Sequence, residues 1–185
     1  MKLYWLDLET TGLDPQKSEI IEVAVAEADF NDPFNYKHIY QNVVHQKLFN
    51  LTEIDPFVIK MHTDNGLFED CSKTGKKLFD IEEDLLTLIP KISNKEDMPI
   101  MAGSSIHFDA SFIKEDWSEL YSRFSYRYYD VSAIKLFCQS LGMPKFPKAN
   151  AHRAKDDIEE SIAHAKACSE WLKHWGWQTT QLDNL

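Results

Sequence analysis

Three strand-like segments within the first 44 residues constrain the fold more than any other feature of the sequence. Residues 3–8 and 20–28 are apolar runs of strand length, and residues 36–44 are rich in aromatic and β-branched side chains. The segment Gly12-Leu13-Asp14-Pro15, which lies between the first two runs, is typical of a turn and suits an antiparallel hairpin. The sequence therefore predicts a meander of three strands.

Helical and strand-like patterns alternate in the rest of the chain. We expect helices at residues 52–61, 76–92, 110–115, 131–141 and 153–174, and strands at residues 99–104 and 128–130. A meander followed by this alternation predicts an α/β domain with a mixed sheet. With 185 residues, of which 43% are hydrophobic, the chain can bury one sizeable core, so we expect a single domain spanning residues 1–185.

Charge and cysteine content limit the classes of function. The net charge of −10 argues against a broad basic face for long nucleic acid, but it leaves room for a short or small anionic substrate. The basic stretch Met143–Lys155, taken alone, is best interpreted as a solvated loop. Cys71, Cys138 and Cys168 form no C-x-x-C pair, and the chain shows no signal peptide or membrane-length apolar run. We expect free thiols and a soluble cytoplasmic protein with no membrane partner.

Asp7 and Glu9 form a candidate metal site at the end of the first strand. Side chains alternate in a strand, so these two acids point to one face while Leu8 points to the other. Neighbouring carboxylates raise each other's pKa unless a cation lies between them, and their oxygens suit Mg²⁺ or Mn²⁺. The alternative is a strand edge with two solvated acids.

Two later segments add acids and a histidine. Asp109 lies where a helix begins after an apolar strand, and it could simply complement the helix dipole. His152 precedes a helix that carries Asp156 and Asp157 in its first turns. Adjacent helical residues face about 100° apart, so only one of these two acids can point at a metal site. Such acids together with a histidine could bind two divalent ions and position a base near neutral pH.

The order and spacing of Asp7-x-Glu9, Asp109 and His152-x-x-x-x-Asp157 resemble the DEDDh class of 3′→5′ exonucleases, which have a ribonuclease H-like fold. Within that class the chain is most similar to oligoribonucleases over nearly its whole length. The similar segments are residues 8–15, 20–22, 43–46, 62–67, 103–106, 126–132 and 156–161. The resemblance implies a mixed five-stranded sheet flanked by helices and the degradation of short RNA, down to dinucleotides, to 5′-nucleoside monophosphates.

The resemblance also implies the roles of the catalytic residues. Two divalent cations, Mg²⁺ or Mn²⁺, would be organised by Asp7, Glu9, Asp109 and Asp157, and the family pattern selects Asp157 over Asp156. We expect Asp7 to bridge the two ions, Glu9 and Asp157 to hold the ion on the nucleophile side, and Asp109 to act on the other ion, directly or through water. His152 would be the general base.

A pocket for very short RNA follows from the same resemblance. Leu13 would insert between two bases, Phe57 would stack on a base, and Tyr126 would reach the site of the neighbouring subunit in a homodimer. Four residues would contact the 5′ phosphate: His62, Ser105, Arg127 and Ser132. From the sequence alone, Leu13 and Phe57 could equally be core residues, and Arg127 could pair with a surface acid.

Two other functions stay open. Thr10 stands where oligoribonucleases usually carry Met, and Asp7-x-Glu9-Thr10-Thr11-Gly12 is frequent in proofreading-type DNA exonucleases and in RNase T. The second hypothesis is therefore a DEDDh exonuclease that acts on single-stranded DNA or RNA 3′ tails. The third is a nucleotide-binding or assembly module without turnover. The chain retains all five catalytic residues of the pattern, which counts against the third hypothesis, and the acidic net charge counts against the second.

Overall fold

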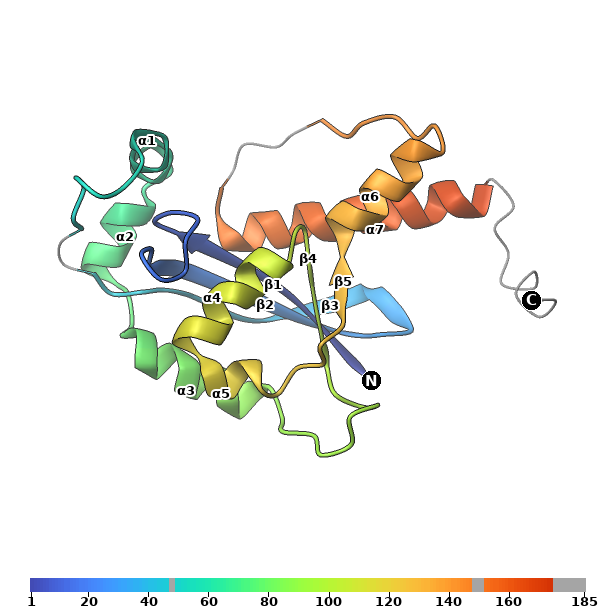
Figure 1. Ribbon diagram of the computed structural model, residues 1–185, viewed down its shortest axis with the longest axis horizontal. Helices are drawn as coiled ribbons and strands as arrows, with labels where there is room; N and C mark the ends of the chain where they lie inside the picture. Colours follow the sequence, from blue (N-terminus) through green and yellow to red (C-terminus); the bar gives the residue numbers. More distant parts are fainter. Residues whose placement is uncertain (47–48, 148–151, 175–185) are drawn as a thin grey trace.

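A five-stranded mixed sheet runs through the centre of the computed structural model, which describes residues 1–46, 49–147 and 152–174 (Figure 1). The first three strands, β1 (Lys2–Thr10), β2 (Ile20–Asp29) and β3 (Asp32–Val43), form an antiparallel meander. The strands β4 (Ile100–Gly103) and β5 (Tyr128–Asp130) continue the sheet parallel to β1, in the order β3-β2-β1-β4-β5. The predicted fold class is therefore confirmed.

The described residues contain seven helices: α1 (Pro56–Asp64), α2 (Leu67–Lys73), α3 (Leu78–Leu88), α4 (His107–Asp116), α5 (Ser118–Tyr121), α6 (Val131–Ser140) and α7 (Ala154–His174). All five predicted helices are present, although α1 begins at Pro56 rather than at residue 52. It begins there because the Asp55 side chain accepts a hydrogen bond from the Phe57 backbone N–H and Pro56 takes the first helical position. The short helices α2 and α5 were not predicted.

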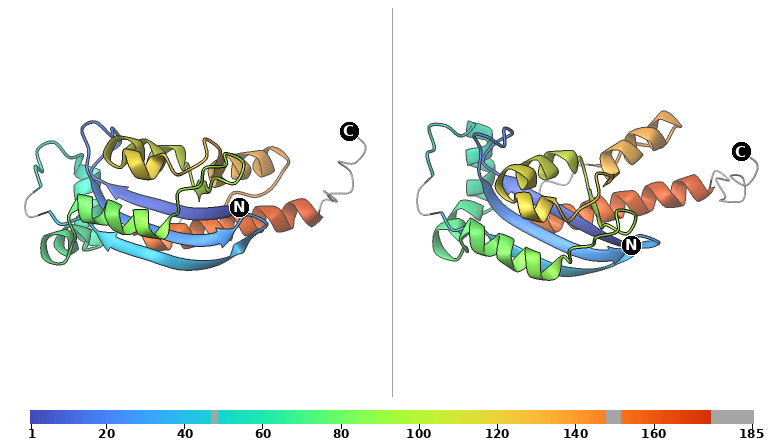
Figure 2. Two further views of the ribbon diagram at one scale, coloured as in Figure 1. Left: turned by 90° about the horizontal axis from the view of Figure 1, so that it is seen from below. Right: turned by 60° about the horizontal axis from the view of Figure 1, so that its bottom comes forward.

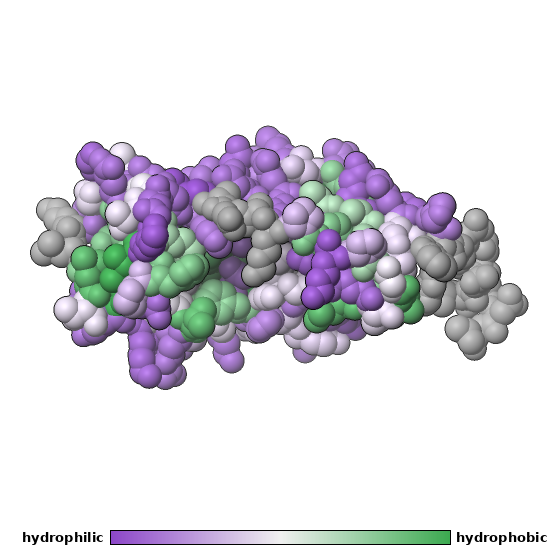
Figure 3. Space-filling view, turned by 90° about the horizontal axis from the view of Figure 1, so that it is seen from above, coloured by the Kyte–Doolittle hydropathy of each residue, from purple (hydrophilic) through white to green (hydrophobic). Residues whose placement is uncertain are grey.

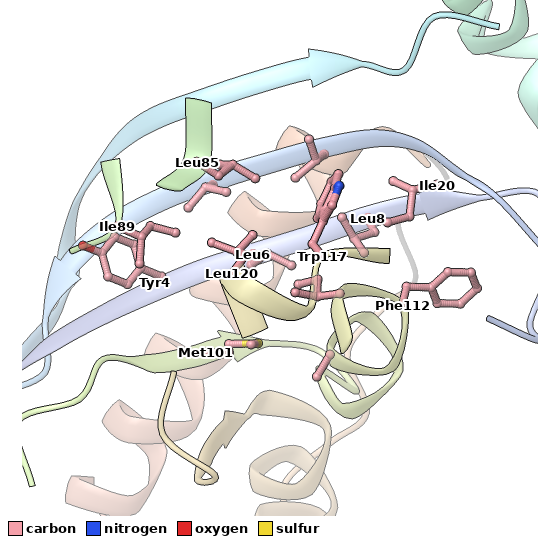
Figure 4. Close-up of a cluster of buried hydrophobic side chains, with 14 of the residues drawn as sticks. Tyr4, Leu6, Leu8, Ile20, Leu85, Ile89, Met101, Phe112, Trp117 and Leu120 are labelled. Carbon is pink, nitrogen blue, oxygen red and sulfur yellow. The ribbon is translucent and has the colours of Figure 1, made fainter. Parts of the chain in front are cut away.

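The two faces of the sheet carry separate cores. Tyr4, Leu6 and Leu8 of β1 pack with side chains of α3, α4 and α5 on one face, where Trp117 and Leu120 also lie (Figure 4). Leu3 and Trp5, which alternate with them, pack against α6 and α7 on the other face. Figure 2 shows the long helix α7 on the opposite side of the sheet from α3 to α5. Helices therefore flank both faces of the sheet.

The described residues bear on two expectations from the sequence, which concern membrane-spanning segments and free thiols. Among the described residues, no helix is both long and apolar enough to cross a membrane. Cys71, Cys138 and Cys168 are buried free thiols. Trp175 and Trp177, near the C-terminus, lie outside the described residues.

Candidate active site

Three carboxylates from two elements meet beside the sheet. Asp7 and Glu9 lie on the face of β1 that carries Leu3 and Trp5, while Leu8 packs in the opposite core, as the alternation predicted. Asp157, in the first turn of α7, reaches the two strand acids, and carboxylate oxygens of the three residues lie within 4.8 Å of one another. Asp156 is exposed instead. The helix phase therefore places Asp157, not Asp156, in the cluster.

The cluster is rich in negative charge, with Glu9 buried and Asp7 and Asp157 half-buried. Burial, with a further contribution from Asp157, raises the pKa of Glu9 to about 9, and only 8% of this residue is exposed. Burial, Asp109 and Glu9 together raise the pKa of Asp7 well above its ordinary value. Burial also raises the pKa of Asp157, while the nearby His152 acts in the opposite direction. A divalent cation would relieve this repulsion, and a set of oxygen donors alone fits Mg²⁺ or Mn²⁺.

Asp109 is tied to β1 rather than exposed at a helix terminus. The parallel pairing of β4 with β1 runs from Leu3 to Trp5, so the N–H of Leu8 lies beyond it and donates to Asp109 Oδ1 at 2.9 Å. Burial raises the pKa of Asp109 to about 7, and this hydrogen bond acts in the opposite direction. Asp109 thus lies near Asp7 but outside the close group of three carboxylates.

A cleft of about 660 Å³ opens beside the carboxylates and is bordered by β1, the loop after it, α1 and His152. Leu13 and Phe57 line this cleft with 83% and 68% of their surface exposed, so their interpretation as core residues is wrong. Figure 3 shows hydrophobic surface gathered at the end of the molecule that carries α1. The Thr10 hydroxyl donates to the Gly12 carbonyl at 2.8 Å and so holds the loop that presents Leu13.

Two of the four expected phosphate contacts lie together. The Ser105 hydroxyl donates to the Ser132 hydroxyl at 3.0 Å, and both backbone N–H groups donate to Asp130 Oδ1. The Asp130 side chain also caps α6. The Asp130 carboxylate therefore fixes the two serines relative to each other.

The other expected phosphate contacts lie elsewhere. His62 is fully buried, with its Nε2 3.3 Å from the Thr10 carbonyl and 3.8 Å from Glu9 Oε2, so a phosphate could reach it only if its ring became accessible. The exposed Arg127 guanidinium lies 5.1 Å from the ring centre of Tyr126, which is 80% exposed. Among the described residues Arg127 forms no ion pair with an acid.

One charged pair was not anticipated. Glu22 of β2 is fully buried opposite Glu9 in the sheet, and Arg153 Nη2 lies 3.1 Å from its Oε1. The interpretation of Met143–Lys155 as a solvated loop is therefore wrong at Arg153, and residues 148–151 of this stretch lie outside the described residues. One signal in the sequence could have identified Glu22. It is the one acid within the apolar run Ile20–Ala26, and a charged side chain buried in such a run needs a partner.

Comparisons with known proteins identify the family of this chain. The exonuclease family model matches residues 4–164. The probable oligoribonuclease of Schizosaccharomyces pombe is 33% identical over 174 residues, which cover 92% of this chain and 68% of the relative. The oligoribonuclease of Corynebacterium diphtheriae is 36% identical, with 87% of this chain and 78% of the relative covered, and that of Actinobacillus pleuropneumoniae is 35% identical, with 89% and 90% covered.

The fold also has a solved counterpart. The crystal structure of E. coli exonuclease I in complex with a dT13 oligonucleotide superposes with a TM-score of 0.64 at 13% sequence identity. That superposition covers 94% of this chain but 42% of the exonuclease I chain, so it supports the fold alone. The length, identity and coverage of the curated relatives show that this chain belongs to the exonuclease family and, within it, to the oligoribonucleases.

Proposed function

We propose that this protein is a metal-dependent 3′→5′ exoribonuclease that degrades short oligoribonucleotides, down to dinucleotides, to 5′-nucleoside monophosphates. Membership in the oligoribonuclease family supports the activity. The observation that carries the proposal is the meeting of Asp7, Glu9 and Asp157 within 4.8 Å beside a cleft whose wall is apolar. The acids that would hold the metal ions therefore lie next to an apolar surface that could contact the bases of the substrate.

Four carboxylates would hold two divalent cations, Mg²⁺ or Mn²⁺. Asp7 would contact both ions, Glu9 and Asp157 the ion on the nucleophile side, and Asp109 the other ion, directly or through water, since one of its oxygens already accepts the Leu8 N–H. When bound, such ions lower the pKa of water and neutralise charge that develops at phosphorus. The raised pKa values of Asp7 and Glu9 support this assignment, because a cation would relieve the same repulsion.

The chain's own side chains would supply the proton transfer and hold the substrate. His152 lines the cleft near Asp157, where it would accept the proton of the attacking water. Leu13 would separate two bases and Phe57 would stack on one, a contact worth about 1–3 kcal/mol per base. Ser105, Ser132, Arg127 and, once accessible, His62 would bind the 5′ phosphate, with Arg127 adding charge-assisted hydrogen bonds. Few contacts would then suffice for a dinucleotide.

A second candidate function is 3′→5′ cleavage of single-stranded DNA or RNA tails. Thr10, whose hydroxyl holds the loop that carries Leu13, favours it, because the Asp7-x-Glu9-Thr10-Thr11-Gly12 form is frequent in proofreading-type exonucleases and in RNase T. The net charge of −10 counts against it, since long strands are bound largely through their phosphates. We therefore place it second.

One cleavage assay separates the candidates. Purified protein would be incubated with Mn²⁺ or Mg²⁺ and 5′-labelled RNA of two and seven nucleotides, alongside single-stranded DNA of the same lengths, with Asp157→Asn as the inactive control. The proposal requires the diribonucleotide to be cleaved much faster than the seven-mer. Equal or faster cleavage of the longer DNA would support the second function, and no metal-dependent product from any substrate would contradict both.

We further propose that the protein acts in the cytoplasm as a homodimer on short single-stranded RNA. The three buried free thiols support a reducing compartment. The exposed Tyr126 supports a contact with a neighbouring subunit, whose site it would reach. Sedimentation at several protein concentrations tests the assembly, and a Tyr126→Ala dimer with unchanged cleavage of the diribonucleotide would contradict the role of Tyr126.

A further inference from the structure

The backbone of His152 needs support from its surroundings. Its φ angle is +46°, in the left-handed region that residues other than glycine rarely adopt. Such a conformation persists where neighbouring contacts determine it. One such contact among the described residues is a hydrogen bond of 2.6 Å from Asn65 Nδ2 to the His152 carbonyl.

Asn65 is itself fixed on several sides. Its backbone N–H donates to the Met61 carbonyl and caps α1, and its Oδ1 accepts from the N–H of Leu67, where α2 begins. Its own carbonyl accepts from Arg153 Nη1 at 3.5 Å. Asn65 therefore connects α1, which carries Phe57, to His152, just before α7.

Arg153 connects this junction to the sheet. Its Nε and Nη2 donate to the fully buried Glu22, whose Oε2 also accepts the N–H of Ala154, the first residue of α7. Arg153 Nη2 lies 3.0 Å from Asp70 of α2 as well. A buried carboxylate needs such a partner, so the position of Arg153 is strongly determined. Glu22 lies opposite Glu9 in the sheet. These hydrogen bonds therefore fix the start of α7 relative to β1, the strand that carries Asp7 and Glu9.

We infer that Asn65, Arg153 and Glu22 form a positioning clamp that sets where His152 stands relative to Asp7 and Glu9, an inference that rests on the proposed function. None of the three residues lines the cleft, so the clamp acts through His152 and not on the substrate. Asn65 is its most specific member, because it holds the His152 carbonyl directly.

The substitution Asn65→Asp isolates this contact. It keeps an oxygen for the Leu67 N–H but replaces the donor that faces the His152 carbonyl with an acceptor. We expect kcat for the diribonucleotide to fall about 10- to 100-fold, as for residues that orient catalytic groups, while KM changes less than about threefold. The matched control is Asn94→Asp, whose amide donates to Asp97 on the exposed surface, and it should leave kcat and KM unchanged.

A double-mutant cycle with His152→Ala distinguishes positioning from general destabilisation. If the clamp acts through His152, Asn65→Asp causes no further loss of kcat in the His152→Ala background. An equal loss in both backgrounds, or an unchanged kcat in Asn65→Asp alone, would overturn the clamp. If Asn65→Asp does not fold, Arg153→Lys replaces it, with the same expected non-additivity and the same contradicting results. His152→Ala with full activity would instead refute the role of His152 in the proposed function, and the clamp with it.

Discussion

The cluster of Asp7, Glu9 and Asp157 and the apolar wall of the cleft are built differently. The three acids lie on a central strand and a long helix, where pairing in the sheet and packing of α7 fix their direction. Leu13 and Phe57 lie on a loop and on a short helix and are largely exposed. Substitutions at Leu13 or Phe57 should therefore disturb less packing than substitutions in the cluster.

The largest effect should come from the acids. Asp157→Asn should lower kcat at least about a thousandfold, because it removes a charge that would hold the ions. Asp156→Asn, at the exposed neighbouring position, should change kcat less than about threefold. Steady-state cleavage of the diribonucleotide measures both, and equal losses in the two variants would contradict the distinction between the half-buried Asp157 and the exposed Asp156.

A smaller effect is expected at the wall. Phe57→Ala should raise KM for the diribonucleotide about 5- to 150-fold with little change in thermal stability, because stacking is lost from a side chain that is 68% exposed. Phe79→Ala on α3 is the matched control, since Phe79 is 64% exposed and does not line the cleft. Should both variants bind the diribonucleotide as tightly as the parent, Phe57 does not stack on a base.

The proposed contact between Arg127 and the 5′ phosphate can be tested by comparing substrates with and without that phosphate. Replacing its guanidinium in Arg127→Gln should reduce the preference for a 5′-phosphorylated over an unphosphorylated diribonucleotide about tenfold, because a charge-assisted contact is lost. The ratio of the two kcat/KM values reports this change and cancels any general loss of activity. An unchanged ratio would remove Arg127 from the phosphate site.

The smallest effect concerns stability and pH. Burial raises the pKa of Glu9 to about 9 in the folded chain, so the folded state binds more protons than the unfolded state between about pH 4.5 and 9. The stability contributed by this group is present at pH 4.5 and is lost as the pH rises, and Tm of the metal-free protein should fall by several degrees over that window. If Mn²⁺ binds the ionised cluster as proposed, it should remove most of the fall. A fall in Tm that Mn²⁺ leaves unchanged would argue against ion binding at Glu9.

Local patterns were sufficient for the strands and for part of the site. Alternation along β1 predicts that Asp7 and Glu9 share a face, because a strand has only two faces and the apolar residues mark one of them. The limits of α6 follow from similar local signals, since Gly142 and Pro144 disfavour a longer helix. These features need no information from distant residues.

Other features depend on contacts far apart in the sequence. The choice of Asp157 over Asp156 depends on how α7 is rotated on the sheet, which its core residues alone do not determine. The pair formed by Arg153 and Glu22 joins residues 131 positions apart, so Arg153 looks like part of a solvated basic loop until the chain folds. The helix α2 has only seven residues, which are too few to show a clear helical periodicity in the sequence. It begins after Gly66, whose φ is positive.

Direct titration with Mn²⁺ tests the central claim most simply, because it needs no assumption about the substrate. Free Mn²⁺ can be followed by electron paramagnetic resonance for the parent protein, Asp156→Asn and Asp157→Asn. The parent and Asp156→Asn should bind Mn²⁺ with equal affinity, and Asp157→Asn should bind it at least about tenfold more weakly. Equal binding by all three proteins, or no binding by the parent, would contradict a metal site at Asp7, Glu9 and Asp157.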